Sequence, residues 1–177
     1  MNQKIIVADN FYDVAHQYRK SFFENQCLIT DETVNKISEM LQQKVNVVEA
    51  FNECLSENTK NTITANNACD WIAVIYLTMP ADCVFTQGMS FYIHSKTQLE
   101  TFPDDYAKSL YGLQTIEDLQ NTFDVCNLKD WKEYMNIFVK YNRIVLFRAD
   151  TWHSYGNGFG NDLNNSMIYQ KVLLQND

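Results

Sequence analysis

An unbroken apolar run constrains the fold of this chain more than any other feature. It reads WIAVIYL, covers residues 71–77, and Pro80 follows soon after it. Its β-branched and aromatic side chains favour a strand, and the absence of alternating polar residues is typical of a strand covered on both faces. The run is far shorter than the roughly 20 apolar residues of a membrane helix. The sequence therefore predicts a central, doubly covered strand in a protein with no membrane partner.

The segments around this run predict two helices followed by several short strands. Val14, Tyr18 and Phe22 recur at every fourth position of a helix expected over 13–25. The triplet Thr30-Asp31-Glu32 opens a second helix, whose expected buried stripe is Val34, Ile37, Leu41 and Val45. Further strands are expected at 4–8, 47–55, 59–64, 89–94, 137–139, 143–147 and 167–174, with short helices and loops over 100–135. This order predicts an α+β fold with a sandwich or barrel-like β-core, in a single domain covering residues 1–177.

Charge and cysteine usage exclude several classes of protein. The net charge of -8, with scattered acidic residues, disfavours nucleic-acid binding, which needs clustered Lys and Arg. The five cysteines are widely spaced and form no CxxC pair, so a structural zinc site is not expected. Reduced, mostly buried thiols in a cytosolic protein are expected instead. The apolar stretch in MNQKIIVADN is too short for a signal peptide.

The three histidines, His16, His94 and His153, are the natural candidates for chemistry. A non-haem Fe(II) oxygenase uses two histidines and one carboxylate, and the first histidine usually stands in an HxD or HxE pair. Here the three contexts read HQY, HSK and HSY. No GxSxG nucleophile elbow is present, and the glycines of GNGFG at 156–160 open no helix after a strand. These glycines are expected to let a loop turn sharply.

Four stretches in this order resemble the 2-oxoglutarate/Fe(II)-dependent dioxygenase superfamily, in particular a small group of uncharacterised members from marine bacteria and phages. They are IIVADNFYDVAHQYRKSFF, DWIAVIYLT, GMSFYIHSKT and YNRIVLFRADTWHSYGNGFG. They resemble, respectively, the opening strand and helix, the strand ending in YLN, the GGxxFYxH segment, and the penultimate strand with the second metal histidine. The resemblance implies a double-stranded β-helix, or jelly roll, with flanking N-terminal helices.

The resemblance carries over to the functional residues unevenly. His153 falls on the distal metal histidine, whereas Thr64 and Asn66 stand at the positions of the HxD pair. Asn164 and Ser166 stand where the arginine that clamps the co-substrate is expected, and no arginine follows Arg148. His153 is then expected to be a satisfied polar residue at the barrel rim, bonded to Thr64 or Asn66. A rescued metal site would have to combine His153 with His94 and with Asp70 or Asp150.

Two classes of function follow from these losses. The first is a non-catalytic binding or assembly protein, a pseudoenzyme on the oxygenase scaffold, for which a structural component of a phage particle is one form. It implies protein partners or self-assembly, and a cytoplasmic or virion-associated location. No cofactor is expected in this class. The second is an active 2-oxoglutarate-dependent Fe(II) dioxygenase with an atypical metal site. The missing HxD pair and arginine favour the first class, because chemistry must be inferred from the site.

Overall fold

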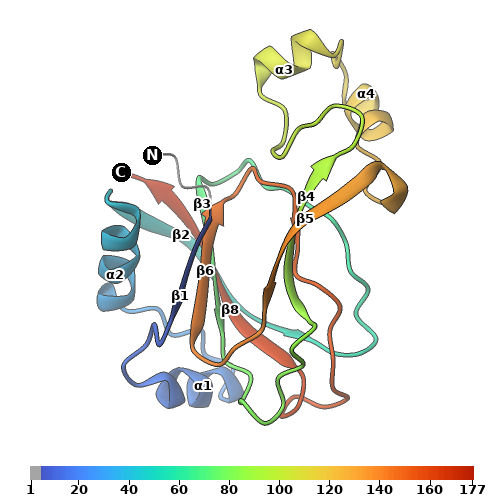
Figure 1. The fold of residues 1–177 in the computed structure, drawn as a ribbon. Coiled ribbons are helices and arrows are strands. Elements are labelled where there is room, and N and C mark those ends of the chain that lie inside the picture. The colour runs from blue at the N-terminus through green and yellow to red at the C-terminus, as the bar shows by residue number, and fades with distance from the viewer. Residues whose placement is uncertain (1–4) are drawn as a thin grey trace.

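The computed structural model describes residues 5–177 and contains two antiparallel sheets that pack face to face (Figure 1). The larger sheet has the order β1 (Ile5–Asp9), β6 (Arg143–Arg148), β3 (Trp71–Tyr76), β8 (Met167–Asn176) and β2 (Val45–Leu55). The smaller sheet has the order β5 (Trp131–Phe138), β4 (Gly88–His94) and β7 (His153–Ser154). The predicted α+β class with a two-sheet β-core is confirmed.

The apolar run forms β3, the central strand of the larger sheet. It pairs with β6 on one side and β8 on the other, and its residues from Ile72 to Tyr76 are almost fully buried. Side chains alternate along a strand. Ile72, Val74 and Tyr76 therefore belong to the core between the sheets, whereas Ala73 and Ile75 pack towards the helices. Burial on both faces explains why the run contains no polar residue.

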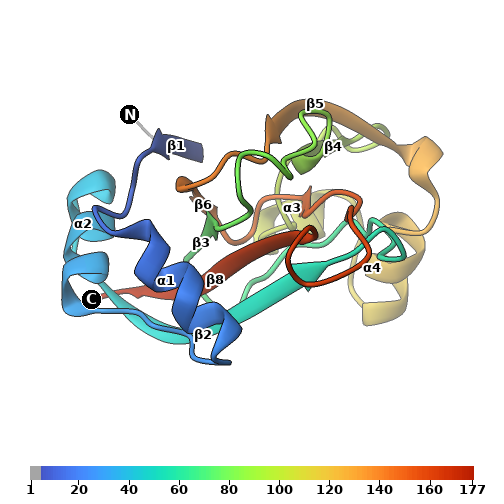
Figure 2. The same cartoon turned by 90° about the horizontal axis from the view of Figure 1, so that it is seen from below.

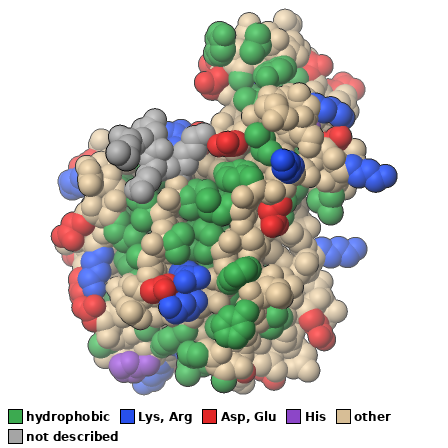
Figure 3. Space-filling model, in the orientation of Figure 1, with side chains coloured by type: hydrophobic (Ala, Val, Ile, Leu, Met, Phe, Trp, Pro, Cys, Tyr) green, Lys and Arg blue, Asp and Glu red, His purple; other side chains and the backbone are tan. Residues whose placement is uncertain are grey.

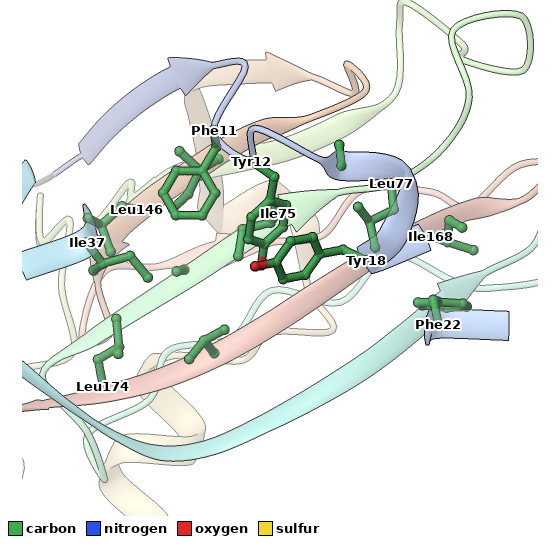
Figure 4. Packing of buried hydrophobic residues seen from close by; sticks show 14 of the residues in the cluster. Phe11, Tyr12, Tyr18, Phe22, Ile37, Ile75, Leu77, Leu146, Ile168 and Leu174 are labelled. Carbon is green, nitrogen blue, oxygen red and sulfur yellow. The ribbon is translucent and has the colours of Figure 1, made fainter. Parts of the chain in front are cut away.

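The helices α1 (Ala15–Phe23) and α2 (Asp31–Leu41) cover the outer face of the larger sheet (Figure 2). The side chain of Thr30 caps α2 by accepting a hydrogen bond from the Thr33 backbone N–H, as the sequence predicts. Figure 4 shows Tyr12 and Tyr18 side by side above the sheet; their rings stack with centroids 3.6 Å apart. The Tyr12 hydroxyl donates to Gln170 Oε1 at 2.8 Å, which links this layer to β8.

The connection between β4 and β5 forms a separate lobe beyond one end of the sheets (Figure 1). It holds α3 (Asp105–Leu110), α4 (Ile116–Thr122) and a 3-10 turn (Leu128–Asp130). The lobe is joined to the sheets by a buried aromatic cluster that includes Phe123, Trp131 and Trp152. Hydrophobic side chains are nevertheless exposed over α3 (Figure 3), and Tyr106 and Leu110 are 77% and 64% exposed.

Several predicted details of the elements are wrong. Residues 59–64 form no strand and contribute only an isolated bridge at Thr64. The strand expected at 137–139 begins at Trp131, so helices and loops do not extend to 135. Val45 belongs to β2 rather than to the buried stripe of α2, of which Val34 and Leu41 are only half-buried. Lys4, in the first expected strand, lies outside the described residues.

The cysteines correct a further expectation. All five are free thiols, as expected, but only Cys69 is buried, and Cys54 and Cys126 are exposed. Within residues 5–177, no helix combines the length and apolar character that a membrane crossing requires.

Candidate functional site

The loop that follows β6 brings His153 against Thr64. His153 begins β7, which pairs with β4 through Phe91. On its other side it exchanges two backbone hydrogen bonds with Thr64, at 2.8 and 2.9 Å. The backbone N–H of Asn66 donates to the Ala149 carbonyl at 2.8 Å, so the segment from Thr64 to Asn66 runs beside this loop.

These three predicted positions line one cavity of about 210 Å³ at the rim of the β-core. Thr64, Asn66 and His153 form its polar side. The remaining lining residues come from β2, β3, β8 and the end of β7: Phe51, Ile72, Tyr155, Lys171 and Leu173. The cavity is smaller than a typical site for a drug-sized ligand, and its volume is that of a site for a small molecule. The positions that the resemblance assigns to the metal site therefore converge.

His153 is a buried, neutral imidazole with a fixed tautomer. The residue is 1% exposed, and burial lowers its pKa to about 4, an effect to which the nearby Lys171 charge contributes. Nδ1–H donates to the Thr151 carbonyl at 2.8 Å, so Nε2 carries the lone pair. The Tyr155 hydroxyl lies 3.4 Å from Nε2. The expected hydrogen bond of the ring is thus made by Nδ1 to Thr151, and Nε2 has only the long contact to Tyr155. Thr64 bonds the backbone of His153 alone, and Asn66 does not bond it.

Lys171 is a further residue of the cavity lining, and sequence reasoning missed it. On β8 the side chains of Met167, Tyr169 and Leu173 face the core between the sheets, and Lys171 shares their face. Its side chain is 21% exposed, and its ammonium lies 3.4 Å from Glu53 Oε1. Nζ also stands 5.2 Å from the Phe51 ring centroid and 5.3 Å from that of Tyr155. In the sequence, the only indication of this residue was one charged side chain on the face of β8 that is otherwise apolar.

The positions matched to the co-substrate arginine lie away from the cavity. Ser166 is buried just before β8, where its hydroxyl donates to the Asp162 carbonyl at 2.6 Å. The Asn164 carbonyl accepts from Arg19 at 3.5 Å. Neither residue lines the cavity with His153.

The residues considered for a rescued metal site are occupied elsewhere. His94 is buried against Phe123 and Trp131, and its Nδ1 bonds Thr97 at 3.0 Å. Asp150 pairs with Arg148 at 2.7 Å, and Asp70 accepts from Gln175 and from the Asn176 backbone. None of the three lines the cavity. Arg143 likewise pairs with an acidic residue, Asp9, at 2.7 Å.

The donor set of the cavity does not fit an Fe(II) ion. A non-haem iron site needs two imidazoles and a carboxylate. The cavity offers one imidazole together with a threonine hydroxyl and an amide, and the Lys171 ammonium adds a repelling charge. Within residues 5–177, no group of three His, Cys, Asp or Glu side chains is placed to hold a metal. No step that requires iron can be derived from these residues.

Comparison with solved structures identifies the fold. SnoN, a non-haem α-ketoglutarate-dependent epimerase from nogalamycin biosynthesis, aligns with a TM-score of 0.58 and 8% identity over 98% of this chain and 78% of SnoN. SnoK, an α-ketoglutarate-dependent carbocyclase from the same biosynthesis, gives 0.57 and 12% over 98% and 80%. HygX of Streptomyces hygroscopicus, solved with nickel and 2-oxoglutarate bound, gives 0.55 and 6% over 98% and 82%.

Sequence comparison adds nothing to this likeness. No protein-family model matches the sequence, and no curated protein is detectably similar to it. At these identities the structural likeness bears on architecture alone, since one fold hosts many functions. The expected jelly roll with flanking helices is confirmed: the chain has the fold of the 2-oxoglutarate/Fe(II)-dependent oxygenases.

Proposed function

We propose that the chain is a non-catalytic binding or assembly protein built on the oxygenase fold. One observation carries the proposal: where the fold's metal ligands are expected to converge, the residues are His153, Thr64 and Asn66, with Lys171 beside them. A single neutral imidazole does not hold Fe(II) tightly, because the carboxylate that offsets the metal charge is missing. A cavity is present at these residues, which supports binding as its use.

A protein partner or a second copy of the chain fits the surface better than a nucleic acid. The net charge is -8, and the exposed apolar side chains of Tyr106 and Leu110 gather on the α3 lobe. Exposed apolar patches of this kind mark contact surfaces. A structural role in a phage particle, with a virion-associated location, is a prediction from the resemblance. A cytoplasmic location is a prediction from the cysteine usage.

A thermal-shift titration tests the proposal. A ligand that binds only the native state raises the melting temperature by mass action. Without oxygen, millimolar Mn(II) as the stand-in for Fe(II), alone or with 2-oxoglutarate, is expected to leave the melting temperature of the wild type and of His153→Ala equally unaffected. A shift that requires both ligands and disappears in His153→Ala, but persists in the exposed His16→Ala control, would instead identify an active oxygenase with an atypical site.

A further inference from the structure

Lys171 gives the cavity a fixed positive charge. Among the eight residues that line the cavity, Lys171 is the charged one; the others are apolar, neutral polar, or the neutral imidazole of His153. Its partner Glu53 lies 3.4 Å away and is not part of the lining. An ammonium has three donors, so the bond to Glu53 leaves Lys171 able to donate to a second anion. In a chain of net charge -8, this cation makes the cavity a favourable place for an anionic group of a ligand.

The neutral side chains restrict what else the ligand carries. His153 Nε2 is an acceptor, because Nδ1–H is committed to Thr151, and its one neighbouring donor is the Tyr155 hydroxyl at a long 3.4 Å. Asn66 accepts from the Ala68 backbone with Oδ1, which leaves its Nδ2 to donate. Phe51, Ile72 and Leu173 supply an apolar wall. A ligand that matches this lining carries one carboxylate, one hydroxyl group that donates a hydrogen bond, and a short apolar tail.

We propose that the cavity between Lys171 and His153 is a metal-free site for a small 2-hydroxy monocarboxylate. The carboxylate pairs with the Lys171 ammonium, and the 2-hydroxyl donates to His153 Nε2. The ammonium, rather than a metal ion, supplies the positive charge. Lys171 is also distinct from the positions of Asn164 and Ser166, where the resemblance places a co-substrate clamp. This inference rests on the proposed function, since it assigns a ligand class to a site without iron.

Titration calorimetry in the presence of EDTA tests the inference with a matched pair of probes. The probes are 2-hydroxy-4-methylpentanoate and 4-methylpentanoate, which differ only in the hydroxyl group. The hydroxy acid is expected to bind the wild type saturably and at least about tenfold more tightly than its partner, because a buried acceptor gains a donor. Equal affinities, or no saturable binding of the hydroxy acid by the folded protein, would overturn the inference.

Three variants test whether Lys171 supplies the positive charge that binds the carboxylate of the ligand. Lys171→Met is expected to weaken binding of the hydroxy acid at least about tenfold, since it removes a charge-assisted bond. Lys44→Met removes the same charge from an exposed side chain and is expected to leave affinity unchanged. Glu53→Gln frees Lys171 from its competitor and is expected to tighten binding, an outcome that misfolding cannot mimic. Unaltered affinity in folded Lys171→Met would overturn the inference.

The test is separable from that of the proposed function. Binding that depends on Mn(II) with 2-oxoglutarate and on His153 contradicts the proposed function. Failure of the hydroxy acid to bind in EDTA, with no metal-dependent shift, contradicts only the ligand assignment.

Discussion

Thr64 and His153 exchange both of their backbone hydrogen bonds, at 2.8 and 2.9 Å. This bridge fixes the segment that would carry an HxD pair beside the strand that carries the distal histidine. The segments to which the resemblance assigns the metal ligands are therefore adjacent, and their side chains at these positions are a threonine, an asparagine and one histidine.

Restoring the missing ligands is expected to restore metal binding. The double variant Thr64→His, Asn66→Asp places an imidazole and a carboxylate on the lining of the cavity that already contains His153. Together they complete the two-histidine, one-carboxylate set. We expect Mn(II) to bind at least about tenfold more tightly than to the wild type, measured by titration calorimetry. The control combines Thr64→His with Asn67→Asp, which moves the carboxylate to an exposed neighbour; equal gains in both variants would contradict the account.

Replacing Gly156 with a larger residue is expected to destabilise the fold. Its φ is +81°, and an added Cβ would lie 2.2 Å from the Gly88 carbonyl oxygen of β4. Gly156→Ala should lower the free energy of unfolding by about 3 kcal/mol or more, from left-handed strain and from the clash. Gly112→Ala, at φ +68° with open space around it, should lose only about 1 kcal/mol. Urea denaturation compares the two, and similar losses would show that the close approach to β4 is not tight.

The buried hydroxyl of Tyr12 is expected to matter more than that of Tyr18, although the two rings stack. Tyr12→Phe leaves Gln170 Oε1 without its 2.8 Å donor inside the protein. We expect a loss of about 1–3 kcal/mol in the free energy of unfolding, the penalty for a buried group left unsatisfied. Tyr18→Phe removes only a part-buried contact to Thr30 at 3.4 Å and should be nearly neutral. Urea denaturation of both variants checks this, and the reverse order would refute it.

Burial of neutral His153 predicts a loss of stability in mild acid. Its pKa is lowered from 6.5 to about 4 on folding, so the unfolded chain takes up the proton first as the pH falls. The free energy of unfolding should therefore decline between about pH 6.5 and 4, by roughly 3 kcal/mol from this group, and level off below. Burial also lowers the pKa of His94, which adds a decline of the same sign.

A pair of variants isolates the part due to His153. His153→Gln should make the decline shallower and leave the part due to His94, whereas the exposed His16→Gln should leave the decline unchanged. Denaturant unfolding across this pH range provides the measurement, and an equally steep decline in His153→Gln would exclude the assigned cause.

The elements that could be predicted from the sequence are those with a strand buried on both faces or with a locally bonded helix cap. The run that forms β3 contains no polar residue because both of its faces are covered, and Thr30 marks the start of α2 because a cap bonds locally. The first part of β5 was missed because four consecutive residues, from Lys132 to Met135, are exposed and a bulge interrupts its pairing with β4. Such a strand carries little alternation to detect.

The candidate site was predictable only in part. The resemblance gave the order of the segments that meet at Thr64, Asn66 and His153. Lys171 was missed because its role depends on which face of β8 turns towards the cavity, which is set by pairing with β2 and β3. A single lysine in a strand does not reveal that pairing, and the resemblance places the co-substrate arginine nearer to His153, at Asn164 and Ser166.

Anaerobic equilibrium dialysis of the wild type against Fe(II), with 2-oxoglutarate present, measures whether the cavity binds iron. The account predicts no specific uptake: the amount of iron per chain should match that of His153→Ala. Uptake that saturates at one iron for each chain, and that is lost in His153→Ala but kept in His16→Ala, would contradict it.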